Sequence, residues 1–122
     1  MHDVEPLVEA VDNLADRFRS LPQSKLLGAV PGYASRAAAA LELARRLARL
    51  ALAAEDGPRR ELPDAGAFAV GDQLAVAGHD LAAALAALPQ DARVARPDGP
   101  VAAAELLAEA LEAVRETATL CR

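Results

Sequence analysis

Four stretches of this chain repeat apolar residues every three or four positions, and connections rich in Pro and Gly separate them. In the first stretch the apolar positions are Val4, Leu7, Val8, Val11, Leu14, Ala15, Phe18 and Leu21. This spacing places the apolar side chains on one face of an α-helix. Ala and Leu, which favour helices, are abundant, whereas the β-branched and aromatic residues that strands need are scarce. The pattern predicts an all-α fold.

The helices are predicted at about residues 3–21, 32–56, 67–88 and 100–120. We expect Pro22 to end the first helix, and Asp98 or Gly99 to cap the last, with Pro100 in its first turn. Four amphipathic helices with connections of moderate length predict an antiparallel four-helix bundle, for which up-down-up-down is the simplest topology. A chain of 122 residues has the length of one domain, so we expect a single domain over residues 1–122.

Charge and composition exclude several classes of protein. The net charge of −5 argues against nucleic acid as a partner. No apolar run approaches the roughly 20 residues of a membrane span, and the N-terminal stretch is acidic where a signal peptide would be basic. We therefore expect a cytoplasmic protein without membrane contact. Cys121 is the single cysteine, so it either links two copies on oxidation or is an inert terminal thiol.

Two glycines interrupt the third predicted helix, although each costs about 1 kcal/mol relative to Ala in a helix interior. In a heptad arrangement Gly71 and Gly78 fall at one core position, while Leu74 and Leu81 fall at the other. We interpret this pattern as a seam where a neighbouring helix approaches closely or a large side chain fills the notch. For Gly71, the alternative is that the glycine marks the start of the helix.

The polar residues beside these glycines do not form a metal site within the helix. Asp72 and His79 are seven residues apart, about 10 Å along a helix, whereas ligand pairs on one helix lie three or four residues apart. Asp80 points away from its neighbour His79 by about 100°. We expect His79 to be a solvated side chain on the polar face, and we expect no metal ion.

Sequence motifs for catalysis and cofactor binding are missing from the chain. It has no nucleophile elbow, no Walker-type or dinucleotide-binding glycine loop, and no Glu-x-x-His pair. Two histidines and one cysteine provide few groups for acid–base or covalent chemistry. We therefore predict no catalytic residues and no cofactor.

Two charged stripes lie on separate predicted helices. The last helix carries glutamates at four-, three- and four-residue spacings, namely Glu105, Glu109, Glu112 and Glu116. They lie opposite the positions predicted to face the core, which are Leu107, Leu111, Val114 and Ala118. We interpret the glutamates as a solvated face, with Mg²⁺ binding as the alternative. The second helix carries a candidate interface made of Arg36, Arg45, Arg46 and Arg49. The two stripes lie on opposite sides if these helices are diagonal, and pair internally if they are adjacent.

These features predict a small non-catalytic interaction module that binds itself or another protein. The apolar surface of the second helix is wider than one bundle seam requires, which is typical of an interface. One alternative is a Mg²⁺-dependent enzyme or ligand-binding bundle that uses the glutamate stripe and a phosphorylated small molecule. The other is a nucleic-acid-associated regulator that uses Arg36, Arg45, Arg46, Arg49, Arg59 and Arg60.

Overall fold

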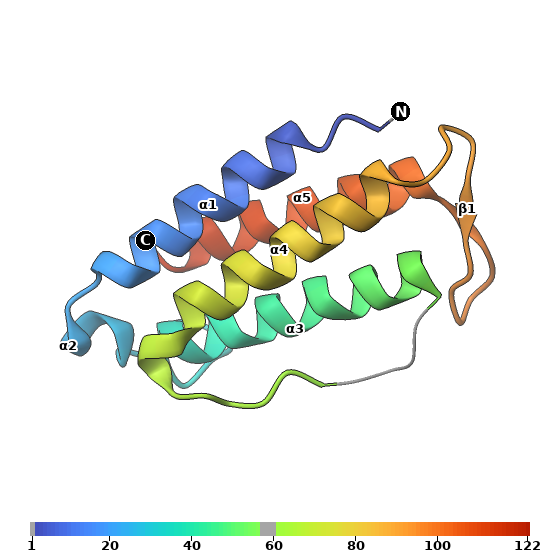
Figure 1. Cartoon of the computed structure of the whole chain (residues 1–122). Helices are drawn as coiled ribbons and strands as arrows, with labels where there is room; N and C mark the ends of the chain where they lie inside the picture. Colours follow the sequence, from blue (N-terminus) through green and yellow to red (C-terminus); the bar gives the residue numbers. More distant parts are fainter. Residues whose placement is uncertain (1, 57–60) are drawn as a thin grey trace.

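Four long helices dominate the computed structural model, which describes residues 2–56 and 61–122 (Figure 1). They are α1 (Glu5–Ser20), α3 (Arg36–Glu55), α4 (Val70–Ala86) and α5 (Ala103–Leu120). A single helical turn, α2 (Gln23–Leu26), follows α1, and a 3-10 turn, η1 (Ala67–Ala69), leads into α4. The four long helices pack against one another, so the predicted all-α four-helix bundle is confirmed.

Local sequence explains where the first two long helices begin and end. Pro6 stands in the first turn of α1, where its missing N–H would have no partner in the helix anyway, and Pro22 follows the end of that helix. Ser35 caps α3 by accepting a hydrogen bond from the backbone N–H of Ala38 at 3.0 Å. At the other end of α3, Asp56 takes a left-handed conformation with φ of 54°, as residues after a helix C-terminus commonly do.

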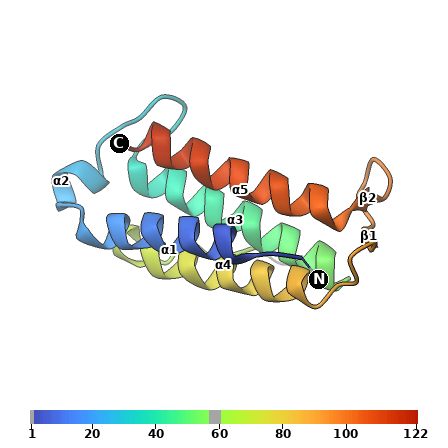
Figure 2. The ribbon, with the colours of Figure 1, turned by 90° about the horizontal axis from the view of Figure 1, so that it is seen from above.

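The four helices form a ring in which each packs against two others. α4 lies between α1 and α3, and α5 packs against α1 and α3 on the other side. Figure 2 shows the bundle from above, with α2 at one end and a short β-hairpin at the other. The second and fourth predicted helices, α3 and α5, are therefore neighbours, which is the arrangement in which the charged stripes can pair internally.

The directions of the helices differ from the simple up-down-up-down order. α1 and α4 are antiparallel, because Arg19 near the end of α1 bonds Asp72 near the start of α4. α3 and α4 run in the same direction, because Leu41 near the start of α3 and Val70 at the start of α4 line one groove (Figure 1). The described part of the connection between them, residues 61–66, runs back along α3, because Arg49 pairs with Glu61 and Arg45 donates to the carbonyl of Leu62.

α3 is buried over a wide arc of its surface. Its buried residues are Ala37, Ala39, Ala40, Leu41, Leu43, Ala44, Leu47, Leu50 and Ala51. At 100° per residue they cover more than half of the circumference, whereas an ordinary surface helix buries a stripe of about 100°. Packing within the chain thus accounts for the wide apolar surface of this helix. In the described part of the chain, no helix combines the length and the apolar character needed to cross a bilayer.

The predicted cap of α5 at Asp98 or Gly99 is wrong. The chain instead forms a small antiparallel hairpin from β1 (Arg93–Val94) and β2 (Val101–Ala102). Residues in β2 are extended to pair with β1, so the helix begins only at Ala103. The hairpin was missed because two-residue strands carry no detectable alternation of apolar and polar residues.

The face of α5 that meets the core is rotated from the predicted one. Its buried residues are Ala103, Leu106, Ala110, Ala113 and Val114. Of the four positions predicted for the core side, Val114 is buried, while Leu107, Leu111 and Ala118 are only half-buried. α5 has more apolar residues than one face can hold, so the periodicity fits two neighbouring faces equally well.

Candidate functional site

Two arginines from distant segments share one carboxylate on α5. Arg46 Nη2 donates to Oε1 of Glu109 at 3.3 Å, and Arg96 Nη1 donates to Oε2 of the same residue at 3.0 Å. Arg46 comes from α3 and Arg96 from the hairpin, so Glu109 ties three elements together. Because two guanidinium groups share one carboxylate, this arginine–glutamate cluster carries one uncompensated positive charge.

A tight turn in the hairpin presents Arg96 to the cluster. The N–H of Gly99 donates to the carbonyl of Arg96 at 2.9 Å and closes a four-residue turn. Pro97 occupies the second position of this turn and Gly99 the fourth, an arrangement typical of type I β-turns. Arg93 Nη2 also donates to the carbonyl of Pro100 at 3.1 Å, which braces the other side of the loop.

A pocket of about 440 Å³ lies beside the arginine–glutamate cluster. Its lining comes from the second half of α3, from the hairpin and from α5, namely Arg46, Arg49, Leu50, Leu52, Ala53, Ala95, Arg96, Pro97 and Glu109. Arg49 is held in place by Glu61 at 3.0 Å and Glu42 at 3.2 Å. The pocket therefore combines apolar walls with guanidinium groups, and we treat it as the candidate functional site.

The ionisation of Glu109 is set by two opposing effects. Partial burial raises the pKa of Glu109, but the hydrogen bonds and positive charges of Arg96 and Arg46 together outweigh it. The pKa of Glu109 therefore lies below its ordinary value of 4.5. A carboxylate whose pKa falls on folding stabilises the fold above its unfolded pKa, and this stabilisation is lost as the pH falls through the folded pKa.

Replacing Glu109 by Gln should lower the free energy of unfolding at neutral pH, because both ion pairs with arginine are lost. The loss should be only about 1 kcal/mol, because solvent weakens the ion pairs of a partly exposed carboxylate. The gap between the melting temperatures of wild type and E109Q should begin to narrow as the pH falls below the ordinary pKa of 4.5. It should close as the pH falls through the lower pKa of folded Glu109, where the carboxylate becomes protonated. Thermal unfolding over a pH series measures this gap. The exposed Glu112 on the same helix provides the control, and a gap that stays constant down to low pH would contradict the role of Glu109.

The remaining arginines of the predicted interface contact backbone within the chain. Arg36 donates to the carbonyls of Cys121 and Arg122 at 3.1 and 2.9 Å, and so satisfies the C-terminal end of α5. Arg45 Nε donates to the carbonyl of Leu62 at 2.9 Å. The other arginines of the nucleic-acid hypothesis lie outside the described residues, namely Arg59 and Arg60. A role of these arginines at an interface stays a prediction.

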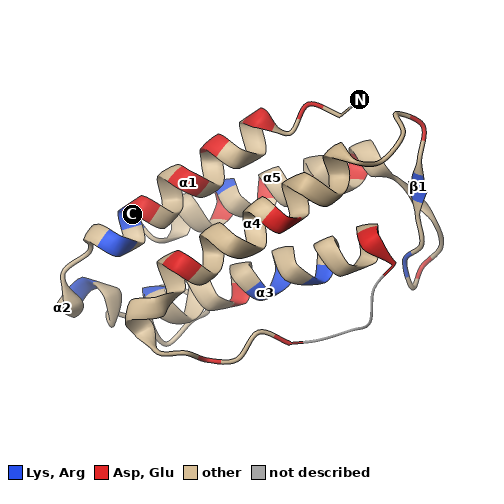
Figure 3. Cartoon of the chain, viewed as in Figure 1, with Lys and Arg blue, Asp and Glu red and all other residues tan. Residues whose placement is uncertain are grey.

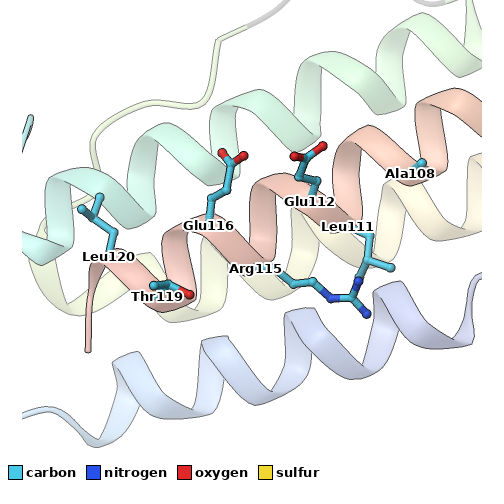
Figure 4. Close-up of a pocket in the computed structure, with 7 residues that line it drawn as sticks. All are labelled: Ala108, Leu111, Glu112, Arg115, Glu116, Thr119 and Leu120. Atoms are coloured by element: carbon cyan, nitrogen blue, oxygen red, sulfur yellow. The ribbon is translucent and has the colours of Figure 1, made fainter.

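Apart from Glu109, the predicted glutamate stripe is exposed to solvent. Its other members are Glu105, Glu112 and Glu116. Figure 4 shows Glu112 and Glu116 on one side of α5 and Arg115 on the other, around a shallow hollow of about 670 Å³. In residues 2–56 and 61–122, no three His, Cys, Asp or Glu side chains gather in a way that suits a metal ion.

Both glycines of the predicted seam lie against α1. A Cβ on Gly78 would be 2.5 Å from Cγ1 and 2.7 Å from Cγ2 of Val11, and one on Gly71 would be 3.0 Å from the carbonyl oxygen of Ala15. Gly71 is also the second residue of α4, so it stands at the helix start as well as at the contact. The leucines of the same predicted pattern, Leu74 and Leu81, are fully buried. The geometry explains the glycines by the close approach of the two helices.

Polar contacts between side chains flank this seam on the solvent side. His79 Nε2 lies 2.6 Å from Oδ1 of Asp12, and Arg19 Nε donates to Oδ1 of Asp72 at 2.8 Å. Each pair joins α4 to α1, so the polar residues beside the glycines have structural partners. Figure 3 shows that acidic residues dominate the visible surfaces of α1 and α4, while basic residues gather on α3 and the hairpin.

Cys121 is buried at the C-terminal end of α5, with 2% of its surface exposed. Burial raises the pKa of the Cys121 thiol, and the positive charges of Arg36 and Arg17 offset this effect only in part. A buried thiol with a raised pKa reacts slowly. Its environment favours the inert interpretation over a disulfide between two copies.

Large apolar side chains are exposed at the end of the bundle that holds α2 and η1. Phe68 is 74% exposed, Leu27 50% and Tyr33 38%. A groove of about 440 Å³ is lined in part by Leu27, Tyr33, Leu41 and Ala67, the residue that precedes Phe68. We call Leu27, Tyr33 and Phe68 the apolar end. No apolar periodicity marks these residues in the sequence, although two of the three aromatic residues of the chain are among them.

The arginine–glutamate cluster with its pocket and the apolar end are thus surface features that point to binding. No family model matches this chain, and no match was found among curated proteins or solved structures.

Proposed function

We propose that this chain is a non-catalytic protein-interaction module that self-associates through its apolar end. The observation that carries the proposal is the exposure of Phe68, which leaves 74% of an aromatic side chain in water. Full burial of such a side chain contributes about 1.5–3 kcal/mol. Aromatic residues are also enriched at the centres of protein interfaces.

The shape of the apolar end supports a second copy of the chain as the partner. Phe68 projects from η1, and Ala67, its neighbour in sequence, lines the groove beside Leu27 and Tyr33. A projecting side chain and a groove therefore stand next to each other on one surface. In a twofold dimer the same surface is used by both copies, so residue pairs occur in both senses. The Phe68 ring of each copy would then enter the groove of the other.

Replacing Phe68 by Ala should shift the protein from dimer to monomer, because it removes the side chain that enters the groove. Light scattering after size exclusion measures the absolute mass of each species at several protein concentrations. For wild type we expect twice the mass of one chain, unchanged in high salt because apolar contacts are not screened.

Val76 provides the matched control, because it is also apolar and exposed but lies on the outer face of α4. V76A should remain dimeric. A wild-type protein that is monomeric at all concentrations would contradict the proposal. So would a dimer that dissociates in high salt, because that behaviour is typical of contacts between charged faces.

A further inference from the structure

The pocket beside the arginine–glutamate cluster has the composition of a site for a small organic anion. Arg46 and Arg96 each use one terminal nitrogen for Glu109 in the described contacts. A guanidinium group carries five N–H donors, so most of the donors on each remain for another acceptor. With one positive charge of the cluster uncompensated, the pocket attracts an anion even though the whole chain is acidic.

The remaining walls of the pocket define the rest of the ligand. Leu52 and Ala53 of α3 stand on one side, and Ala95 and Pro97 of the hairpin stand on the other. These side chains offer apolar contact and no charge. An inorganic anion would leave them exposed, whereas an anion with a compact apolar group would cover them.

We propose that this pocket binds a small organic anion whose carboxylate or phosphate group lies against Arg46 and Arg96 and whose apolar group lies between α3 and the hairpin. Glu109 is the internal counter-ion that keeps both guanidinium groups in place when the pocket is empty. Its negative charge also repels the ligand, so it limits the affinity. The site lies on the second half of α3, away from the apolar end, and does not depend on self-association.

The test uses phenyl phosphate and benzoate as probes, with inorganic phosphate and neutral benzyl alcohol for comparison. Amide shifts in nuclear magnetic resonance spectra of the isotope-labelled full chain report binding residue by residue. Either organic anion should produce saturable shifts at Leu50, Ala53 and Ala95, with a dissociation constant of the order of 1 mM. Inorganic phosphate should bind more weakly, and benzyl alcohol should not bind at this site.

Variants separate a binding site from a purely structural cluster. R96Q should weaken binding about tenfold through the loss of a charge-assisted hydrogen bond, and E109Q should strengthen it several-fold by removing the repelling carboxylate. If circular dichroism shows that R96Q does not fold, binding to R46Q tests the same prediction. Arg115, exposed on α5 outside the pocket, provides the charge-matched control, and R115Q should bind as wild type does.

The absence of saturable shifts at these amides with both organic anions would overturn the proposal. Equal weakening of binding by R115Q and R96Q would also overturn it, because the attraction would then come from overall charge and not from this pocket.

Discussion

Replacing Gly78 by Ala should destabilise the protein by about 2 kcal/mol, although Ala favours a helix over Gly by about 1 kcal/mol. The new Cβ would lie 2.5 Å from Cγ1 and 2.7 Å from Cγ2 of Val11. Val11 is fully buried, and its branched side chain has little freedom to rotate away. Relief therefore requires α1 and α4 to move apart, and overpacking of this kind costs about 1–3 kcal/mol. Chemical denaturation measures the change in the free energy of unfolding.

A double-mutant cycle with Val11→Ala isolates the cause, because this substitution removes both clashing methyl groups. In the V11A background, G78A should be neutral or stabilising by up to about 1 kcal/mol, since only the gain in helix propensity remains. An equal cost of G78A in both backgrounds would show that the close approach of α1 and α4 at Val11 is not the reason for this glycine.

Replacing Leu47 by Ala should cost about 3 kcal/mol, within the range of about 2–5 kcal/mol for a fully buried leucine. Leu47 has no exposed surface and lies in the middle of α3, which packs against α4 and α5, so its truncation leaves a cavity in the core. Leu52 on the same helix is only half-buried and serves as the matched control. Chemical denaturation should show a clearly smaller loss for L52A. Equal losses would contradict the burial of Leu47 in the core.

The sequence was most informative where apolar residues follow a regular period. All four long helices were predicted with ends within a few residues of the observed ones. The heptad pattern also placed Gly71 and Gly78 on the apolar side of their helix, where the structure brings α1 against them. The extent of a helix and the direction of its apolar face depend on residues within that helix, so its periodicity predicts them.

Features that depend on contacts between distant segments were less predictable. Periodicity could not show that α3 and α5 are neighbours, so it left open whether Arg46 would face Glu109 or lie on the opposite side. Arg96 stands in a connection without periodicity, and only the Pro-Asp-Gly sequence after it signals a turn. No local pattern links this turn to Glu109, thirteen residues later.

Contacts between distant segments also decide which apolar surfaces are buried and which are exposed. The wide apolar face of α3 indicated exposure, but it is covered by two neighbouring helices and by the segment that contains Leu62. Phe68 and Tyr33, by contrast, are exposed. They belong to short connecting segments, where hydrophobicity alone does not predict burial. Which apolar residues stay in water is decided by how the helices pack.

The most direct test of self-association through the apolar end is an isotope-filtered nuclear Overhauser measurement. It uses an equal mixture of isotope-labelled and unlabelled chains and detects only contacts between copies. We predict intermolecular signals from the Phe68 ring protons to the methyl groups of Leu27 and to the Tyr33 ring. A sample with no intermolecular signals, or with signals only from another surface such as the outer face of α4, would contradict the account.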